Sequence, residues 1–437
     1  MKLNTVFSAA LAISALLNVS GVALAAQGDT IAGYKLLTTI TVPGGIGQDA
    51  TAWVDTPTAR LYLADTGNPR IIVIDTLNNV YLTSIALPAA PSGVLVISRS
   101  REVWVGLANS TVAVISTDTN TITGTISTGG TARAGQLAYD PIDRLIMIAN
   151  DKDSPAFVTF INQQTRTVVK SVPFDGTQAP LATTGLGQPI WDIIAAKFYI
   201  SVPTTPASPK GEIDEIDPVL MTVTRRFPTT CAAAGLAQLP SQRVITSCGD
   251  IIDISSGNLV TTIAGVGADE VWYNPGDKRV YFGGGMDTTT VPVIDAVNYQ
   301  LIASLPAGKL QAAPLTNQTA QRLSADSDSN QIYVPVTGLG VEVWRNGAFL
   351  NVFPSPVPDS GPFGLATLTW FAPNADTIEI RLGSPSGQLF YHGANRGTVQ
   401  TGSWVTDGMT FYLQDVSGGN ALTLANTMAT LTVVLSH

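Results

Sequence analysis

The side chains of this sequence that are best suited to chemistry are carboxylates and amides that stand beside short apolar runs. Their oxygens are the ligands that Ca²⁺ and Mg²⁺ prefer, and a cation held by them can polarise a carbonyl group and lower the pKa of a bound water. The same residue types also cap turns by accepting hydrogen bonds from backbone N–H groups. The candidates are Asp49, Asp65, Asn68, Asn150, Asp151, Asp153, Asp269, Glu270 and Asp287. Both interpretations, a ligand or cation site and a set of turn caps, remain open.

Histidine is nearly absent, which removes several kinds of catalytic site. The chain has two histidines, His392 and His437, both near its C-terminal end. The preceding residues therefore lack a Ser-His-Asp triad, a histidine general base, His-ligated zinc or copper and axial histidine ligation of haem. No C-x-x-C-H motif and no Gly-Lys-Ser/Thr phosphate loop occurs. The sequence favours a protein without catalysis and without a cofactor, apart from the Ca²⁺ or Mg²⁺ considered above, and we expect His392 at the surface.

The chain has two cysteines, Cys231 and Cys248, with the turn Leu239–Gln242 between them. A hairpin folded about that turn would place the two positions nearly opposite each other, which suits a disulfide. Free thiols and a redox or metal role are the alternatives, although no C-x-x-C spacing is present.

The elements that must position these side chains are short strands in a repeat. The clearest unit has four apolar runs within residues 51–86, separated by turn residues. Its second run recurs in copies that begin at Arg60, Glu102, Arg144, Lys197, Arg243, Arg279 and Gln331. These copies lie about 36 to 53 residues apart, which brackets the period of roughly 40 to 45 residues of a four-stranded propeller blade.

Two further features fit a ring of such units. An Asp or Asn that suits the turn between the first two strands precedes five copies, namely Asp55, Asp140, Asp192, Asn274 and Asp326. The segment Tyr34–Val42 predicts an unaccompanied strand before the first unit. We expect this strand to complete the seventh unit and so remove an exposed sheet edge.

These residues resemble a known repeat family. Leu61–Ala64 with Val73–Thr76 is similar to the YVTN repeat, and Ala64–Ile72 looks like the NHL repeat signature. The resemblance covers about residues 34–350 and implies a seven-bladed β-propeller. Such propellers host lactonases, lyases, haem enzymes and binding proteins, so the resemblance says little about function.

The propeller would bring the candidate carboxylates and amides to one rim, because the loop into each inner strand and the loop between its second and third strands emerge on the same face. A cation held there would resemble the site of lactonase-type propellers. The loop Pro203–Gly211 extends from the same face, either as a lid over a ligand or as a tolerated insertion.

The C-terminal part reads as a separate unit. Residues 351–364 are rich in Pro, Ser and Gly, which predicts a linker. Residues 365–437 contain six alternating runs at the spacing of a small immunoglobulin-like or fibronectin-like β-sandwich. Its aromatic side chains suit either a core or a strip that stacks on sugars. The residues concerned are Trp370, Tyr391, Trp404 and Tyr412.

The N-terminus has the pattern of an export signal. Residues 1–25 contain Lys2, an apolar run over Val6–Leu17 and an A-x-A cleavage pattern ending near Ala26. We therefore expect a periplasmic or extracellular protein that does not insert into the membrane. A net charge of -9 without a basic cluster argues against nucleic acid as a partner.

The sequence thus predicts an all-β protein with a signal peptide (1–25), a seven-bladed propeller (30–350), a linker (351–364) and a small β-sandwich (365–437). Its predicted function is non-catalytic binding or scaffolding through the rim and channel mouth, with a protein or glycan partner. Two alternatives remain: a Ca²⁺- or Mg²⁺-dependent lactonase or hydrolase, and polysaccharide recognition through the sandwich.

Overall fold

The computed structural model describes residues 30–31, 34–48, 50–284, 290–308, 319–345, 348–354, 357–358, 361, 363–372, 375–423 and 426–436. The expected signal peptide, Asp49 and Asp287 lie outside these residues. Helix within the described residues is limited to three short 3-10 turns, η1 (Thr56–Thr58), η2 (Ser98–Ser100) and η3 (Ser417–Gly419). The all-β class is therefore confirmed.

Most of the described strands form antiparallel sheets of four consecutive strands. The first sheet contains β3 (Thr51–Asp55), β4 (Arg60–Asp65), β5 (Arg70–Asp75) and β6 (Val80–Ala86), and the second contains β7 (Pro91–Ile97), β8 (Glu102–Leu107), β9 (Thr111–Ser116) and β10 (Thr121–Ser127). The third sheet contains β11 (Leu137–Asp140), β12 (Leu145–Asn150), β13 (Phe157–Asn162) and β14 (Thr167–Pro173), and the fourth contains β15 (Pro189–Asp192), β16 (Lys197–Val202), β17 (Glu212–Asp217) and β18 (Thr222–Pro228). The fifth sheet contains β19 (Leu236–Leu239), β20 (Arg243–Thr246), β21 (Asp250–Asp253) and β22 (Asn258–Thr262), and the sixth contains β23 (Glu270–Asn274), β24 (Arg279–Gly283), β25 (Val291–Asp295) and β26 (Leu301–Leu305).

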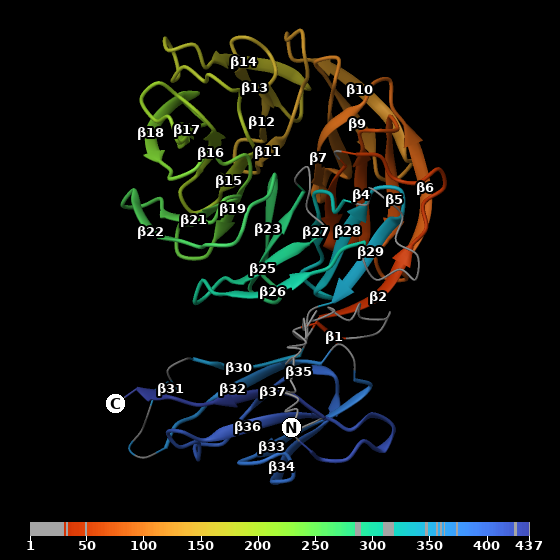
Figure 1. Cartoon of the computed structure of the whole chain (residues 1–437), viewed down its shortest axis with the longest axis vertical. Coiled ribbons are helices and arrows are strands. Elements are labelled where there is room, and N and C mark those ends of the chain that lie inside the picture. The colour runs from red at the N-terminus through yellow and green to blue at the C-terminus, as the bar shows by residue number, and fades with distance from the viewer. Residues whose placement is uncertain are drawn as a thin grey trace, which may run out of the picture.

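The seventh sheet joins the two ends of this series. It has the order β1-β2-β29-β28-β27, with β27 (Ser324–Ala325), β28 (Gln331–Val336) and β29 (Gly340–Arg345) continued by the N-terminal strands β2 (Tyr34–Ile40) and β1 (Thr30–Ile31). Thr39 of β2 pairs with Glu342 of β29, and the two strands run side by side in Figure 1. The expectation that the N-terminal strand pairs with the last repeat is confirmed.

The seven sheets form a closed ring (Figure 1). The first strand of each sheet contacts the first strand of the next, from β3 through β7, β11, β15, β19 and β23 to β27, and β27 contacts β3. The first strands therefore line the centre of the ring. This arrangement is compatible with a propeller-like repeat fold.

The core of the ring consists of seven apolar clusters among the described residues, one between each pair of neighbouring sheets. The second and third strands are covered on both faces, so that every residue of β12 is buried. The outermost strand has one exposed face, as in β6, where buried and exposed positions mix. Continuous apolar runs and alternating runs therefore mark inner and outer strands respectively.

A left-handed residue precedes the second strand in all seven sheets. The seven residues have φ between 50° and 56° and none is glycine: Ala59, Arg101, Arg144, Ala196, Gln242, Lys278 and Asn330. In four of these turns the predicted Asx residue accepts a hydrogen bond from a backbone N–H two residues later, as Asp140 and Asp192 do. These turns, which we call the Asx turns, all lie on one face of the ring, and the candidate site described below lies on the other face.

The C-terminal segment forms separate sheets. One sheet has the order β30-β32-β35, with β30 (Phe349–Phe353), β32 (Thr367–Phe371) and β35 (Arg396–Gln400). A second sheet has the order β34-β33-β36-β37, with β33 (Thr377–Leu382), β34 (Gln388–Ala394), β36 (Thr410–Asp415) and β37 (Thr427–Thr432). In a third, β31 (Val357–Pro358) pairs with β38 (Leu435–Ser436). Residues 351–353 and 357–358, expected in a linker, are thus paired strand residues. Pro354 directly follows β30, and a proline at this position does not exclude pairing at the edge of a sheet.

The C-terminal sheets meet the ring at its seventh sheet. Arg396 donates a hydrogen bond of 2.6 Å to the backbone oxygen of Asp328, in the turn between β27 and β28. Arg345 at the end of β29 lies over the ring of Phe371. This turn belongs to the face that carries the Asx turns, so this contact is made on that face of the ring. No helix of the described residues is long and apolar enough to cross a bilayer.

Candidate functional site

The candidate site lies on the face of the ring where each first strand begins and each second strand ends, which we call the rim. Because the strands are antiparallel, the loops into β11, β15 and β23 emerge beside the turn that follows β12. Asp151, Asp269 and Glu270 therefore lie on the same face, as the sequence predicted.

A cavity of about 270 Å³ opens at the centre of the rim. It is lined from the second to the seventh sheet by residues at or just before the first strands. These residues include Ser92, Gln136, Gln188, Ala234, Asp269 and Arg322, together with Arg133, Asp151 and Lys152 from neighbouring loops. The cavity is thus a property of the ring rather than of any one sheet.

Two arginine–aspartate pairs dominate the electrostatics of this cavity. Arg133 and Asp151 approach to 2.6 Å between Nη2 and Oδ2, and Arg133 Nε donates a second hydrogen bond to Oδ1 of the same carboxylate. Arg322 and Asp269 approach to 3.4 Å. The Lys152 side chain is exposed and has no ion pair within the described part of the chain. The cavity can therefore offer both signs of charge to a partner.

Glu270 directly follows Asp269 in the chain, and its side chain is buried rather than part of the cavity lining. Its side chain is 4% exposed and accepts a hydrogen bond of 2.9 Å from the hydroxyl of Thr51. Burial raises the pKa of the Glu270 carboxyl to about 7; Arg322 opposes this rise and Asp269 adds to it. A fraction of this carboxyl is therefore protonated near neutral pH, and its role in the described structure is to join two sheets.

Asp65 and Asn68 have structural roles away from the cavity. Asp65 is fully buried and accepts hydrogen bonds from the backbone N–H of Gly47, from Asn68 Nδ2 and from Arg70 Nε, at 2.9 to 3.1 Å. A side chain on Gly47 would come within 2.5 Å of the Gly67 backbone, so two loops meet here at glycines. For these two candidates the structure supports the turn-cap interpretation.

Asn150 and Asp153 also hold neighbouring segments together, although Asp153 Oδ2 is buried without a hydrogen-bond partner among the described residues. Asn150 is buried, accepts a hydrogen bond of 2.6 Å from Thr128 Oγ1 and donates one of 2.9 Å to Thr159. Asp153 accepts hydrogen bonds from the N–H and hydroxyl of Thr131. Of the described candidates, Asp151 and Asp269 line the cavity and Glu270 is buried next to Asp269 in the chain, whereas Asp65, Asn68, Asn150 and Asp153 do not line it.

The carboxylates expected to hold Ca²⁺ or Mg²⁺ face arginines. Asp65, Asp151 and Asp269 each form an ion pair with an arginine. Among the described residues, three His, Cys, Asp or Glu side chains converge only at Cys231, Cys248 and Asp250, and the two sulfurs there are bonded to each other.

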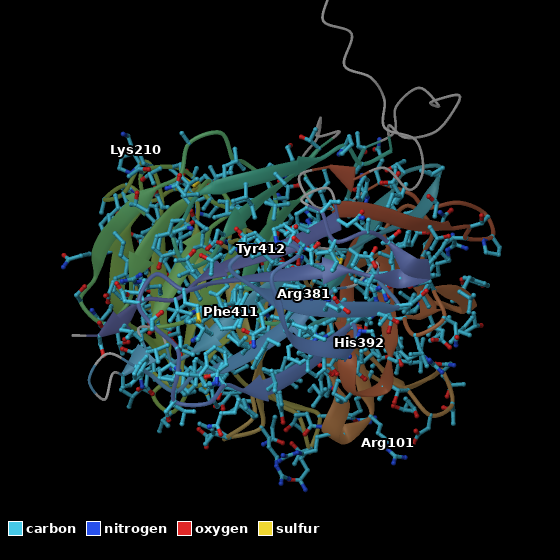
Figure 2. The ribbon with its side chains drawn as sticks, turned by 90° about the horizontal axis from the view of Figure 1, so that it is seen from below. Arg101, Lys210, Arg381, His392, Phe411 and Tyr412 are labelled. Carbon is cyan, nitrogen blue, oxygen red and sulfur yellow. A yellow bond between two sulfur atoms is a disulfide. The ribbon has the colours of Figure 1, made fainter. Side chains whose placement is uncertain are left out.

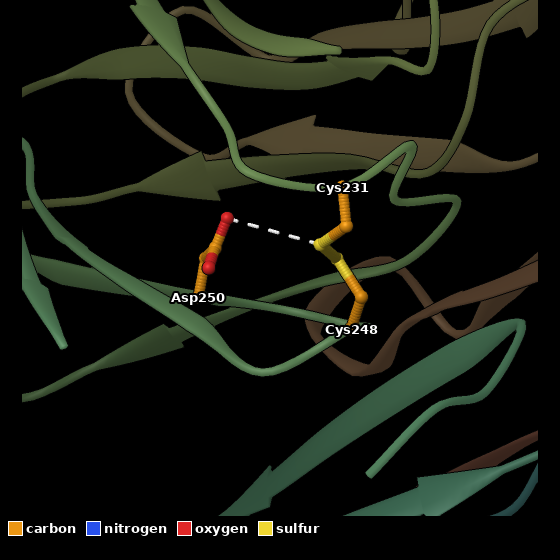
Figure 3. Close-up of side chains that lie close together, drawn as sticks. All are labelled: Cys231, Cys248 and Asp250. Atoms are coloured by element: carbon orange, nitrogen blue, oxygen red, sulfur yellow. Dashed lines mark hydrogen bonds between the residues drawn. A yellow bond between two sulfur atoms is a disulfide. The ribbon is translucent and has the colours of Figure 1, made fainter. Parts of the chain in front are cut away.

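The predicted disulfide between Cys231 and Cys248 is confirmed, with a Cα–Cα distance of 6.4 Å. Figure 3 shows it beside the buried Asp250, whose carboxylate accepts hydrogen bonds from the N–H and hydroxyl of Thr230. The β19–β20 hairpin lies between the cysteines, with Leu239 opposite Arg243. The bridge ties the loop that enters β19 to the turn that leaves β20, both on the rim.

Three of the four aromatic candidates of the C-terminal sheets, Trp370, Tyr391 and Trp404, pack in one core, whereas the half-buried Tyr412 is not part of it. Trp370 is 2% exposed, and its ring centroid lies 4.4 Å from that of Tyr391. Trp404 packs against the same apolar cluster. These contacts support the core interpretation over a strip that stacks on sugars. His392 is exposed beside Glu379, as expected, and lies on these sheets in Figure 2.

Sequence reasoning missed the cations of the rim. Arg133, Lys152 and Arg322 stand in or beside the loops that were searched for oxygen ligands, and each lies close in space to one of the predicted carboxylates. Searching those loops for both signs of charge would have found them. The residues of the loop Pro203–Gly211 reach the cavity only at Pro203.

Comparison with known proteins assigns no relative: no family model matches the chain, and no curated protein matches it.

Proposed function

We propose that this chain is an exported, non-catalytic binding protein: a seven-bladed β-propeller of the YVTN/NHL type followed by an immunoglobulin-like β-sandwich. Support for the propeller comes from the closed ring of seven sheets and from the closure of the last sheet by β2. Support for the sandwich comes from the C-terminal sheets and their shared core. Export is supported by the N-terminal sequence and fits a disulfide.

The observation that carries the binding proposal is the rim cavity with its two arginine–aspartate pairs and Lys152. The arginines and aspartates of these pairs can form new ion pairs with the charged groups of a partner. A cavity of about 270 Å³ can hold one long side chain. Mixed charge suits a polypeptide, which offers both signs, better than a neutral glycan. We therefore propose a polypeptide segment as the partner.

Selection of peptides from a random phage-displayed library on the mature protein tests this function. The test variant is Lys152→Glu, which reverses an exposed charge at the cavity. The matched control is Arg101→Glu, which makes the same change in charge in the turn before β8, on the other face; Arg101 lies at the lower margin of Figure 2, on the side opposite Lys210.

Selected peptides are expected to lose at least tenfold in affinity for Lys152→Glu, to keep their affinity for Arg101→Glu, and to bind more weakly as salt rises. Equal affinity for both variants would overturn the rim as the binding site. Turnover of an ester or lactone that depends on a metal and is abolished by Asp269→Ala would overturn the non-catalytic assignment.

Export has its own test. N-terminal sequencing of the protein recovered from outside the cytoplasm should begin near Ala26, and recovery of only the uncleaved chain would contradict it.

A further inference from the structure

A second cavity lies at the other end of the ring's centre. It has a volume of about 370 Å³ and is lined by the first strands. Its lining includes Tyr139, Pro141 and Gln238, at the ends of β11 and β19, whereas the rim cavity meets the beginnings of these strands. Gln188 lines both cavities. The ring thus has a polar mouth on the rim and a second mouth of different character.

Aromatic side chains dominate this second cavity. Trp53, Tyr139, Trp191, Trp272 and Tyr273 come from the first, third, fourth and sixth sheets, and all five side chains are half-buried. The rings of Trp53 and Trp272 meet edge to face, with centroids 5.4 Å apart. Trp191 meets Phe198 at 4.7 Å. These rings are held by contact with the inter-sheet cores, so the cavity is formed before any ligand arrives.

The polar groups of the cavity are few and uncharged. No Asp, Glu, Lys or Arg is found among its described lining residues. Gln188 accepts a hydrogen bond from the backbone N–H of Leu236, which leaves its amide NH₂ as a donor. Gln238 offers a second amide, and Trp191 Nε1 is a buried donor without a partner among the described residues.

We propose that this cavity binds a small, uncharged aromatic molecule that carries a hydrogen-bond acceptor. Flat rings can stack on or meet the edges of several tryptophans at once, and such contacts add to the burial of apolar area. The amides of Gln188 and Gln238 would set the orientation of the ligand. This site is separate from the rim cavity and does not depend on the proposed function.

Two other ligand classes fit less well. A sugar ring brings several hydroxyl groups, and each one buried without a partner costs about 1–3 kcal/mol, whereas the lining offers two amides and a few aromatic N–H and O–H groups. A quaternary ammonium ion suits aromatic rings, but here it would be desolvated without a carboxylate in the lining.

Fluorescence titration of the full mature protein with N-phenyl-1-naphthylamine, a neutral aromatic probe, tests the proposal. Trp272→Leu removes one wall of the cavity. Gln238→Trp keeps every aromatic residue and fills the space, so it separates loss of volume from loss of a ring. Ile194→Ser is the matched control, because Ile194 is 67% exposed in the turn after β15 and would bind the probe only non-specifically.

Saturable probe binding to the wild-type protein and to Ile194→Ser is expected, with an affinity at least tenfold lower for Trp272→Leu and for Gln238→Trp. Unchanged melting temperatures would show that the variants fold. Competition by maltose or by tetramethylammonium, in place of competition by a neutral aromatic compound, would overturn the ligand class. Absence of saturable binding, or equal binding by Gln238→Trp, would overturn the site. Peptide binding at the rim is measured in a different assay, so the failure of one proposal does not decide the other.

Discussion

The hydroxyl of Thr51 donates a hydrogen bond of 2.9 Å to the carboxyl of Glu270, across 219 residues of sequence. Thr51 belongs to the first sheet and Glu270 to the sixth, and the seventh lies between them with a first strand, β27, of only two residues. Ser324 of β27 accepts a hydrogen bond from the backbone N–H of Val54. Because β27 is short, Thr51 of the first sheet and Glu270 of the sixth come within hydrogen-bond distance of each other. The two hydrogen bonds join the first sheet to the sixth and seventh sheets.

Replacement of Thr51 by valine should therefore destabilise the ring. The valine has nearly the same shape but leaves the buried Glu270 carboxyl without its donor, which costs about 1–3 kcal/mol. Urea denaturation measures the change. Thr125→Val is the control, because Thr125 lies exposed on the outer strand β10 and should tolerate the change. Equal effects of the two substitutions would contradict a role for this hydrogen bond.

Glu270 predicts a pH dependence of stability. Its folded-state pKa of about 7 lies above the ordinary value of 4.5, so the folded state holds the proton more tightly than the unfolded state. The contribution of this group is complete below the ordinary pKa and is lost as pH rises through 7, by at most about 1.4 kcal/mol per pH unit.

The variant Glu270→Gln keeps an acceptor for Thr51 but cannot ionise. Its melting temperature should change less than that of the wild-type protein between pH 5 and pH 8. Parallel curves for the two proteins would show that Glu270 does not titrate in this range.

Asp214 offers a second case of the same sign. It lies on β17 and is fully buried, and neither of its carboxyl oxygens has a hydrogen-bond partner among the described residues. Burial raises its pKa to about 8, Glu212 adds to the rise and Arg226 opposes it. The proton stabilises the folded state at low pH, and this contribution is lost as pH rises through 8.

We expect Asp214→Val to raise the melting temperature at pH 9 and to raise it less, or lower it, at pH 6, because an unpartnered buried carboxylate is replaced by an apolar side chain. Loss of stability at pH 9 would mean that Asp214 has a partner that stabilises its charged form.

The disulfide should contribute measurably to stability. A bridge over a sequence separation of 17 residues is worth about 3 kcal/mol. Cys231→Ser with Cys248→Ser should lower the free energy of unfolding by about that amount, as measured in urea. Addition of dithiothreitol should destabilise the wild-type protein and leave the double variant unchanged. A wild-type protein indifferent to the reductant would contradict this prediction.

Much of the ring was predictable because its pattern is local. The Asx residues Asp140 and Asp192 mark turns that their own side chains cap, and the lone strand over 34–42 indicated that it pairs with the last repeat. The left-handed turn residues were not predictable, because Ala59 or Arg144 has no glycine-like signature, and the geometry of the turn imposes the conformation.

The rim was only partly predictable, because some of its contacts are set by strand order and others by loops that lie far apart in the sequence. Strand order alone places Asp151 and Asp269 on one face. Their arginine partners depend on how loops of different sequence position meet, as Arg133 and Arg322 show. The second cavity arises from the same cause, because Trp53 and Trp272 come together only when the ring closes. The C-terminal sheets begin at β30, earlier than predicted, because proline composition hid a paired strand.

The most direct test of binding at the rim is hydrogen–deuterium exchange of the mature protein with and without a peptide selected on it. Protection is expected in residues 131–136, 151–153, 184–188 and 269–270, which line or flank the rim cavity. Protection confined to the C-terminal sheets or to the Asx-turn face, with none in these segments, would contradict the account.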